Sequence, residues 1–243
     1  KKDSKKFSNK DEIITISKLN FELTSDQKKT LRDINKDISS KNKMFRLLQG
    51  DVGSGKTIVS LISALNVINS GYQVAFMAPT EILARQHYTL SKKIFSNKIN
   101  IEILSSKTDY SKKKIILEKI KNNKTNIVFG THSLFQKKII FKKLGYIIID
   151  EQHKFGVRQR KLLSDKGGRN CDILLMSATP IPRTLTMTLY GDMDLSIIGE
   201  KPKFRKEIIT YSKLDSKIDE VIRFVKKELN EDNQVFWVCP LIE

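Results

Sequence analysis

One stretch of eight residues has the types and the spacing needed to hold a chain of phosphate groups. It fits the pattern G-x-x-x-x-G-K-[ST] and consists of Gly50, Asp51, Val52, Gly53, Ser54, Gly55, Lys56 and Thr57. The glycines permit close backbone approach, so amide groups can surround a triphosphate at the N-terminus of a following helix. Lys56 would reach the β- and γ-phosphates, and the Thr57 hydroxyl would ligate Mg²⁺. The pattern predicts ATP and Mg²⁺ as ligands, the alternative being a glycine-rich turn without function.

Two carboxylates follow an apolar run that is suited to a buried central strand. Asp150 and Glu151 come directly after Tyr146–Ile149, at a strand's carboxyl end, where open α/β sheets bind ligands. Asp150 would hold Mg²⁺, directly or through water, while Glu151 would orient and polarise the water that attacks the γ-phosphate. The alternative is an acidic helix cap. Together with Lys56, these residues are the predicted catalytic groups.

The elements that position these groups alternate along the chain. Short apolar runs and amphipathic helical segments take turns from Phe45 onward, which is typical of parallel strands joined by helices. We expect strands at Phe45–Gln49, Val74–Ala78, Ile101–Ser105, Asn126–Gly130, Tyr146–Asp150 and Ile173–Ser177. The fold class is therefore α/β, a P-loop domain with a mostly parallel sheet covered by helices on both faces.

The pattern restarts after Pro202. A strand is expected at Glu207–Tyr211, a helix with one apolar face after it, and a strand at Gln234–Cys239. We divide the chain into a linker at residues 1–20, a first domain at 21–200 and the truncated start of a second domain at 201–243. The absence of an initiator Met and the apolar run just before the end suggest that both ends are cut.

Composition points to a polyanionic partner. Lys+Arg 45 against Asp+Glu 27 gives a formal net charge of +18, which favours nucleic acid through counterion release. A lysine-rich composition with solvated side chains is the alternative. No run approaches the roughly 18 apolar residues of a membrane span, and no secretory signal is present, so we expect a cytoplasmic protein without a membrane partner. Two distant cysteines support neither a disulfide framework nor a zinc site.

Longer motifs carry a family resemblance. Asp150-Glu151-Gln152-His153 forms a DExH-type box, and Ser177-Ala178-Thr179 matches the companion motif of superfamily 2 helicases. Specific strings continue both motifs, at residues 154–160, 180–184 and 189–194. On these residues the chain resembles the RecG-type ATP-dependent DNA helicases from about Phe21 to its end. The resemblance implies that hydrolysis is coupled to DNA movement by Gln152, His153, Ser177, Ala178 and Thr179.

The resemblance also implies an organisation and a partner. Residues 21–200 would be the first RecA-like domain, residues 1–20 a linker from an upstream wedge domain, and residues 201–243 the start of a second RecA-like domain. The family members are monomeric translocases on branched duplex DNA, such as stalled replication forks and Holliday junctions, in the bacterial cytoplasm and associated with the nucleoid. The transcription-repair coupling factor Mfd is the alternative, because it has a similar Thr-Pro-Ile-Pro-Arg-Thr stretch.

Shorter motifs add candidate contacts. The segment Phe21–Gln27 resembles a Q-type motif, in which Gln27 would bind the adenine edge through paired hydrogen bonds. The alternative is a helix N-cap at Thr24 or Ser25 with an exposed glutamine. Two further segments resemble DNA-contact motifs, with candidate phosphate-binding residues Thr80, Arg85, Thr131 and His132. Ordinary capping and surface polarity remain the alternative for these four residues.

Two further expectations concern single residues, and two rival functions are weighed against the helicase interpretation. We expect His87 on a helix surface and Arg183 in a coupling or DNA-facing role. A DNA-binding scaffold with a decayed ATPase is disfavoured by the intact Lys56, Thr57, Asp150 and Glu151. A P-loop kinase for a small molecule would leave the DExH box and Ser177-Ala178-Thr179 unexplained.

Overall fold

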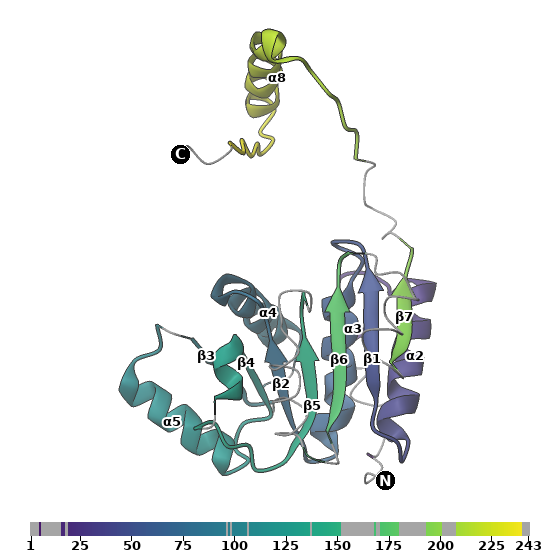
Figure 1. Cartoon of the computed structure of the whole chain (residues 1–243), viewed down its shortest axis with the longest axis vertical. Helices are drawn as coiled ribbons and strands as arrows, with labels where there is room; N and C mark the ends of the chain where they lie inside the picture. The colour runs from purple at the N-terminus through teal and green to yellow at the C-terminus, as the bar shows by residue number, and fades with distance from the viewer. Residues whose placement is uncertain are drawn as a thin grey trace. The chain divides into compact units, whose positions relative to one another are not determined.

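Parallel strands form one sheet at the centre of the first of two units, residues 1–203 (Figure 1). The computed structural model describes residues 5, 16–17, 19–95, 97, 99–105, 107–136, 138–151, 168, 171–179, 193–200 and 208–239. In these residues the strands are β1 (Phe45–Gly50), β2 (Gln73–Met77), β3 (Ile101–Leu104), β4 (Ile127–Gly130), β5 (Leu144–Ile149), β6 (Asp172–Ser177) and β7 (Asp194–Ile198). Their order is β3-β4-β2-β5-β6-β1-β7, and every paired strand runs parallel to its neighbour. This confirms the predicted parallel sheet.

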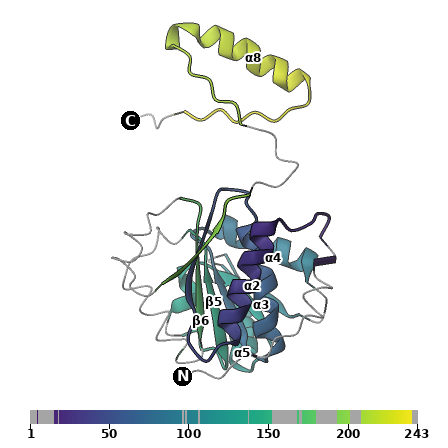
Figure 2. The same ribbon diagram turned by 90° about the vertical axis from the view of Figure 1, so that its right-hand side faces the viewer.

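Helices cover both faces of the sheet, as predicted. They are α2 (Ser25–Ser39), α3 (Lys56–Asn69), α4 (Glu81–Ile94) and α5 (Tyr110–Lys121), with a short 3₁₀ helix, η1 (His132–Phe135). Figure 2 shows α2, α3 and α4 on one side of the sheet, and α5 packs into the core of the other side. No helix within the described ranges is long and apolar enough to cross a membrane.

The two core layers follow from the alternation of side chains along each strand. In β2, Val74 and Phe76 join the core with α2 and α3, whereas Ala75 and Met77 join the core with α5. Successive strand residues point to opposite faces, so a strand with both faces covered is apolar except at its ends. Strands β2, β4, β5 and β6 are buried along their whole length.

Sequence patterns placed most of these strands and missed one. Strand β5 begins at Leu144, two residues earlier than expected, and ends at Ile149, so Asp150 is the first residue beyond it. Strand β7 was not predicted. It lies at the edge of the sheet beside β1, where only some of its residues are buried. Its sequence, Asp-Leu-Ser-Ile-Ile, therefore contains polar residues and no long apolar run that would predict a strand.

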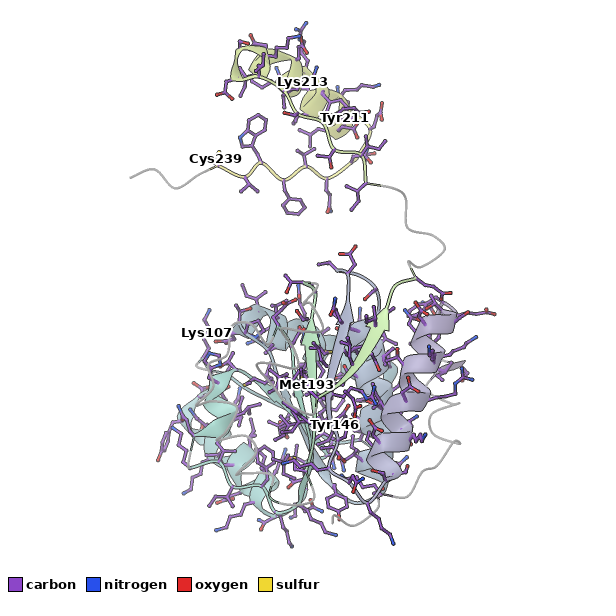
Figure 3. All side chains as sticks on the ribbon, turned by 45° about the vertical axis from the view of Figure 1, so that its right-hand side comes forward. Lys107, Tyr146, Met193, Tyr211, Lys213 and Cys239 are labelled. Atoms are coloured by element: carbon purple, nitrogen blue, oxygen red, sulfur yellow. The ribbon has the colours of Figure 1, made fainter. Side chains whose placement is uncertain are left out.

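Residues 204–243 form a separate unit. Its helix, α8 (Ile218–Asn230), follows the 3₁₀ turn η4 (Asp215–Lys217) and confirms the predicted helix. The predicted strands at Glu207–Tyr211 and Gln234–Cys239 are wrong for the residues described, because 208–211 and 234–239 have no strand. Isolated strand pairs are marginal without a sheet or a helix to pack on. Apolar side chains of this unit stand exposed (Figure 3), among them Phe236 at 87% and Val238 at 90%.

Part of the segment expected to be a linker contacts the first unit. Ile16 and Leu19 pack against the core that contains α2 and α3. The ammonium group of Lys5 lies 2.5 Å from a carboxylate oxygen of Asp172, and both side chains are fully buried. These residues of the 1–20 segment are therefore attached to the domain.

The buried sheet yields a paired stability prediction. Tyr146 is fully buried (Figure 3), its hydroxyl lies 3.1 Å from Ser63 Oγ, and burial raises the pKa of the phenol. Tyr146→Phe should lower the free energy of unfolding by only about 1 kcal/mol, because Ser63 keeps its bond to the Ser60 carbonyl. Ile148→Ala should cost about 2–5 kcal/mol by leaving a cavity. Urea unfolding followed by far-UV circular dichroism measures both, and equal losses would contradict the assigned packing.

Candidate active site

Five neighbouring strands carry the predicted functional residues at one edge of the sheet. In the order β4-β2-β5-β6-β1, their carboxyl ends lead to Thr131, Thr80, Asp150, Ser177 and the Gly50–Thr57 segment, which we call the phosphate loop. Because the strands are parallel, all five ends lie at the same edge, which is the ligand-binding edge of open α/β sheets. The candidates for phosphate and Mg²⁺ contact therefore lie at the ends of β1 and β5, the coupling candidates at the end of β6, and the DNA-contact candidates after the adjacent β2 and β4.

The phosphate loop is shaped by its glycines. Gly53 and Gly55 have φ values of 76° and 90°, in the left-handed region that favours glycine. A Cβ at Gly50 would lie 2.6 Å from Ser54 Oγ, so the backbone is closely packed on itself there. Ser54 Oγ is buried and lacks a hydrogen-bond partner among the described residues. A phosphate oxygen would supply the missing acceptor, so this loop fits a triphosphate.

Lys56 is buried within the phosphate loop. Its side-chain nitrogen donates to the Gly50 carbonyl at 2.6 Å and to the Asp51 carbonyl at 3.0 Å. Burial lowers the pKa of Lys56, and the nearby carboxylates of Asp150, Glu151 and Asp51 act in the opposite direction. The ammonium group is thus held inside the loop by two neutral acceptors that an anionic phosphate could replace.

Asp150 is held by contacts on three sides. Its amide donates to the Met77 carbonyl at 2.9 Å, which ties the residue to the end of β2. One carboxylate oxygen accepts the Glu151 amide at 3.0 Å, and the other lies 2.8 Å from His87 Nε2. Glu151 has a φ of 50°, a strained conformation for a residue with a side chain, of the kind that clusters at functional sites.

His87 lies in this site, so the expectation of a helix-surface histidine was wrong. Its side chain is buried, and its ring packs on Phe76 with centroids 4.7 Å apart. The buried residues of α4 recur at helical spacing and are Ala84, His87, Ser91 and Ile94. That spacing was the signal in the sequence, because a histidine in line with alanine and isoleucine lies on the inward face.

Gln27 contacts the phosphate loop from α2. Thr24 caps α2 in a capping box: its side chain accepts the Gln27 amide, and Gln27 Oε1 accepts the Thr24 amide at 2.9 Å. The predicted cap is therefore confirmed, but the glutamine is buried rather than exposed. Gln27 Nε2 donates to the Ser54 carbonyl at 2.7 Å. Adenine binding by Gln27 stays a prediction, and it would require exchange of one of these bonds.

The candidate coupling residues lie only partly within the described chain. Ser177 is buried at the end of β6, and its hydroxyl contacts the Thr179 carbonyl at 3.2 Å and the Thr179 hydroxyl at 3.0 Å. This local turn carries Ala178 and the exposed Thr179 between Asp150 and the phosphate loop. Gln152, His153 and Arg183 lie outside the described residues. Their coupling roles stay predictions.

The DNA-contact candidates line the end of β2 and β4. Thr80 is exposed and caps α4 by accepting the Leu83 amide at 3.3 Å, so ordinary capping is at least part of its role. Arg85 pairs with Glu81 at 3.7 Å and stays 59% exposed. Thr131 begins η1 without a side-chain capping bond, and His132 is exposed.

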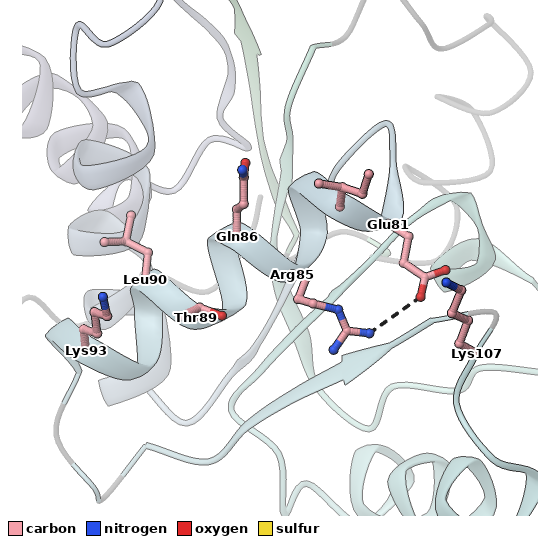
Figure 4. Close-up of a pocket in the computed structure, with 8 residues that line it drawn as sticks. Glu81, Arg85, Gln86, Thr89, Leu90, Lys93 and Lys107 are labelled. Atoms are coloured by element: carbon pink, nitrogen blue, oxygen red, sulfur yellow. Dashed lines mark ion pairs between the residues drawn. The ribbon is translucent and has the colours of Figure 1, made fainter. Parts of the chain in front are cut away.

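A groove of about 560 Å³ runs along the outer side of α4 (Figure 4). Its lining residues are Glu81, Ile82, Arg85, Gln86, Thr89, Leu90, Lys93 and Lys107. Three of the four charged residues are cationic, and Figure 4 shows the Glu81 to Arg85 ion pair at one end. Arg85 and Lys107 are exposed cations that suit a phosphate backbone, and Lys93 adds a further positive charge in the last turn of α4.

Comparison with known proteins decides the family. The profile of the DEAD/DEAH box helicases matches residues 24–188. The chain belongs to this family. It is 50% identical over 230 residues to the ATP-dependent DNA helicase RecG of Aquifex aeolicus, covering 94% of this chain and 29% of that protein. It is 46% identical over 239 residues to RecG of Bacillus subtilis, covering 98% and 35%. The chain thus spans about a third of the length of these curated relatives.

Solved structures agree with this membership. A structure of RecG bound to a three-way DNA junction matches with a TM-score of 0.86 and 40% identity, covering 99% of this chain and 32% of that one. The DEAD-box helicase Mss116 bound to ssRNA and UDP-BeF matches with a TM-score of 0.64 at 21% identity, over 92% of this chain and 51% of that one. The second likeness is one of fold alone.

The geometry of the phosphate loop gives a mutational test. Gly55→Ala places a methyl group at a φ of 90° and 2.3 Å from Gln27 Nε2. Gly71→Ala is the matched control, because its φ of 79° carries similar strain and nothing lies within 4 Å. Both variants should lose about 1–2 kcal/mol of stability through the left-handed backbone. Only Gly55→Ala should also lose about tenfold or more in affinity for a fluorescent ATP analogue with Mg²⁺. Unchanged affinity would contradict the phosphate-loop assignment.

Proposed function

We propose that this chain is the ATP-binding motor part of a RecG-type DNA helicase, which couples ATP hydrolysis to translocation on branched duplex DNA. The observation that carries the proposal is the placement of the phosphate loop, Asp150 and Glu151 at one sheet edge in a chain 50% identical to a RecG helicase. Stalled forks and Holliday junctions are the proposed substrates. A solved RecG structure contains a three-way DNA junction, which supports a branched partner.

The nucleotide part of the proposal uses the residues at β1 and β5. Lys56 exchanges its two carbonyl partners for the β- and γ-phosphate oxygens, and the loop amides bind the remaining charge. Glu151 orients the attacking water and accepts its proton. The Gly50–Thr57 loop and Gln27 form the cofactor-binding set, with Gln27 on the adenine.

Thr57 and Asp150 are the residues that would hold Mg²⁺. The described residues contain no cluster of three His, Cys, Asp or Glu side chains that could form an all-protein metal site. Mg²⁺ commonly takes one or two carboxylates together with substrate phosphates and waters, so a single carboxylate beside a phosphate loop fits this cation. When bound, it neutralises charge that develops on the phosphate oxygens.

The DNA part uses the strands next to β5. Thr80, Arg85, Thr131 and His132 would bind backbone phosphates, which position a duplex without reading its bases. The net charge of +18 supports this polyanionic partner. Asp150 follows β5, directly beside β2, so the candidate metal carboxylate borders the strands that carry the DNA-contact candidates. Ser177–Thr179 follow β6, between Asp150 and the phosphate loop, and are proposed to couple hydrolysis to DNA movement together with Gln152 and His153.

The organisation that accompanies this function is also a proposal. Residues 21–200 form the first RecA-like domain, residues 201–243 begin the second, and residues 1–20 connect to a wedge domain. The protein acts as a monomer at DNA in the bacterial cytoplasm, associated with the nucleoid. The RecG likeness at 46–50% identity favours this assignment over a transcription-repair coupling factor.

Hydrolysis gives the first test of the proposal. In a chain extended to the length of the relatives, Glu151→Gln should keep ATP binding but lower DNA-stimulated turnover by about 10²–10⁴, because the amide retains the shape and loses the basic oxygen. Glu118→Gln, an exposed residue of α5, makes the same charge change away from the site and should keep turnover. A steady-state ATPase assay with forked DNA measures both variants. Normal turnover by Glu151→Gln would refute its role.

Salt dependence tests the DNA contacts. The logarithm of the binding constant for forked DNA should fall linearly with the logarithm of salt concentration, and binding should show no sequence preference. Arg85→Ala should lower the magnitude of that slope by about 1. Lys124→Ala is the control, because Lys124 is exposed just before β4, at the opposite edge of the sheet. Fluorescence anisotropy at several salt concentrations gives the slopes. A change with Lys124→Ala equal to that with Arg85→Ala would point to diffuse charge instead.

A further inference from the structure

One histidine connects α4 to the candidate metal carboxylate. His87 Nε2 lies 2.8 Å from Asp150 Oδ2, and both side chains are about nine-tenths buried. An ionised carboxylate only accepts hydrogen bonds, so Nε2 carries the hydrogen and donates it. The imidazole is packed against Phe76, with ring centroids 4.7 Å apart and an interplanar angle of 42°. The donor therefore has a fixed position.

The orientation of the Asp150 carboxylate depends on this donor. Its Oδ1 accepts the amide of the next residue, Glu151, at 3.0 Å, a contact that comes from the same turn of the chain. The bond from His87 to Oδ2 comes from a different element, and so it fixes the rotation of the carboxylate relative to the sheet. Each carboxylate oxygen keeps a further lone pair for a cation or its water.

We propose that His87 is a positioning residue of this site: its Nε2–H holds the Asp150 carboxylate in the orientation that Mg²⁺ binding needs. The inference rests on the proposed function, in which Asp150 is a magnesium ligand. Outer partners of metal ligands orient them, and removing such a partner lowers metal affinity by about 10- to 100-fold. His87 acts through Asp150 and does not contact the metal itself.

A role in packing alone is the competing explanation, and two substitutions separate it from positioning. His87→Gln keeps an N–H at the position of Nε2 but removes the ring that packs on Phe76. His87→Phe keeps a ring against Phe76 but removes the donor. If His87 positions Asp150, the glutamine variant keeps Mg²⁺ binding and the phenylalanine variant loses it. If His87 acts only in packing, the phenylalanine variant keeps stability and Mg²⁺ binding better than the glutamine variant.

The test is a Mg²⁺ titration of this chain with a fluorescent ATP analogue. The measured quantities are the Mg²⁺ concentration at half-maximal binding and, separately, the thermal unfolding midpoint. His87→Phe should raise that concentration about 10- to 100-fold, while His87→Gln should stay near the unmodified chain. Analogue binding in EDTA should be the same in all variants. Tyr88→Phe, which removes a hydroxyl from the adjacent residue of α4, is the matched control and should change nothing.

A third variant keeps the inference testable if His87→Phe does not fold. His87→Asn carries the same amide as glutamine on a side chain one carbon shorter, so its N–H does not reach Asp150 and its effect should resemble that of phenylalanine. Equal Mg²⁺ dependence of the asparagine and glutamine variants would overturn the inference. An unchanged or lowered Mg²⁺ requirement in His87→Phe would also overturn it, the latter because His87 would then compete with the cation.

Asp150→Ala separates this inference from the proposed function. If Asp150→Ala leaves the Mg²⁺ requirement unchanged, then Asp150 is not a ligand and the proposed metal site itself fails. If Asp150→Ala raises the requirement but His87→Phe does not, the metal site stands and only the positioning role of His87 fails.

Discussion

Burial of the sheet on both faces is the constraint on which the rest of this structure depends. Strands β2, β4, β5 and β6 are enclosed along their whole length, so a charged group in the middle of one would lack water. Polar side chains are therefore found at the strand ends, where Asp172 begins β6 and pairs with Lys5, and in the residues just beyond them. Asp150 is the clearest case, because it follows Ile149, a fully enclosed strand residue, and is still mostly buried. The site is where the apolar runs stop.

This arrangement makes neighbouring segments share their anchoring contacts. The β2–α4 segment reaches Asp150 twice, through the Met77 carbonyl and through His87. A displacement of α4 relative to β5 would break the His87 bond, so α4, which carries Arg85, is linked to the candidate metal carboxylate. Helix α2 contacts both the phosphate loop and the end of β7. Gln27 donates to the Ser54 carbonyl, and Asp26 accepts the amides of Gly199 and Glu200, each at 2.9 Å.

The sequence predicted the fold class and the phosphate loop because both have strong local signals. A fully buried strand must be apolar, and a glycine pattern between a strand and a helix has few other uses. His87 was missed because its role depends on Asp150, 63 residues away. Edge strand β7 was missed because only part of it is buried. The strands expected after Pro202 were wrong because an apolar run forms a strand only beside a partner strand, and none is present in the described part of that unit.

In the proposed function, phosphate binding at the loop replaces existing hydrogen bonds of Lys56 and adds a new one at Ser54. Lys56 already donates to two loop carbonyls, and a phosphate that takes its charge must displace them. Ser54 Oγ differs, because it is buried without a partner among the described residues and gains a bond outright. An anionic phosphate adds Coulombic attraction to the Lys56 ammonium group that a neutral carbonyl lacks, so the exchange favours the anion. In the proposed function the loop therefore favours a strongly charged ligand, because a neutral acceptor would offer Lys56 no more than the carbonyls that it already contacts.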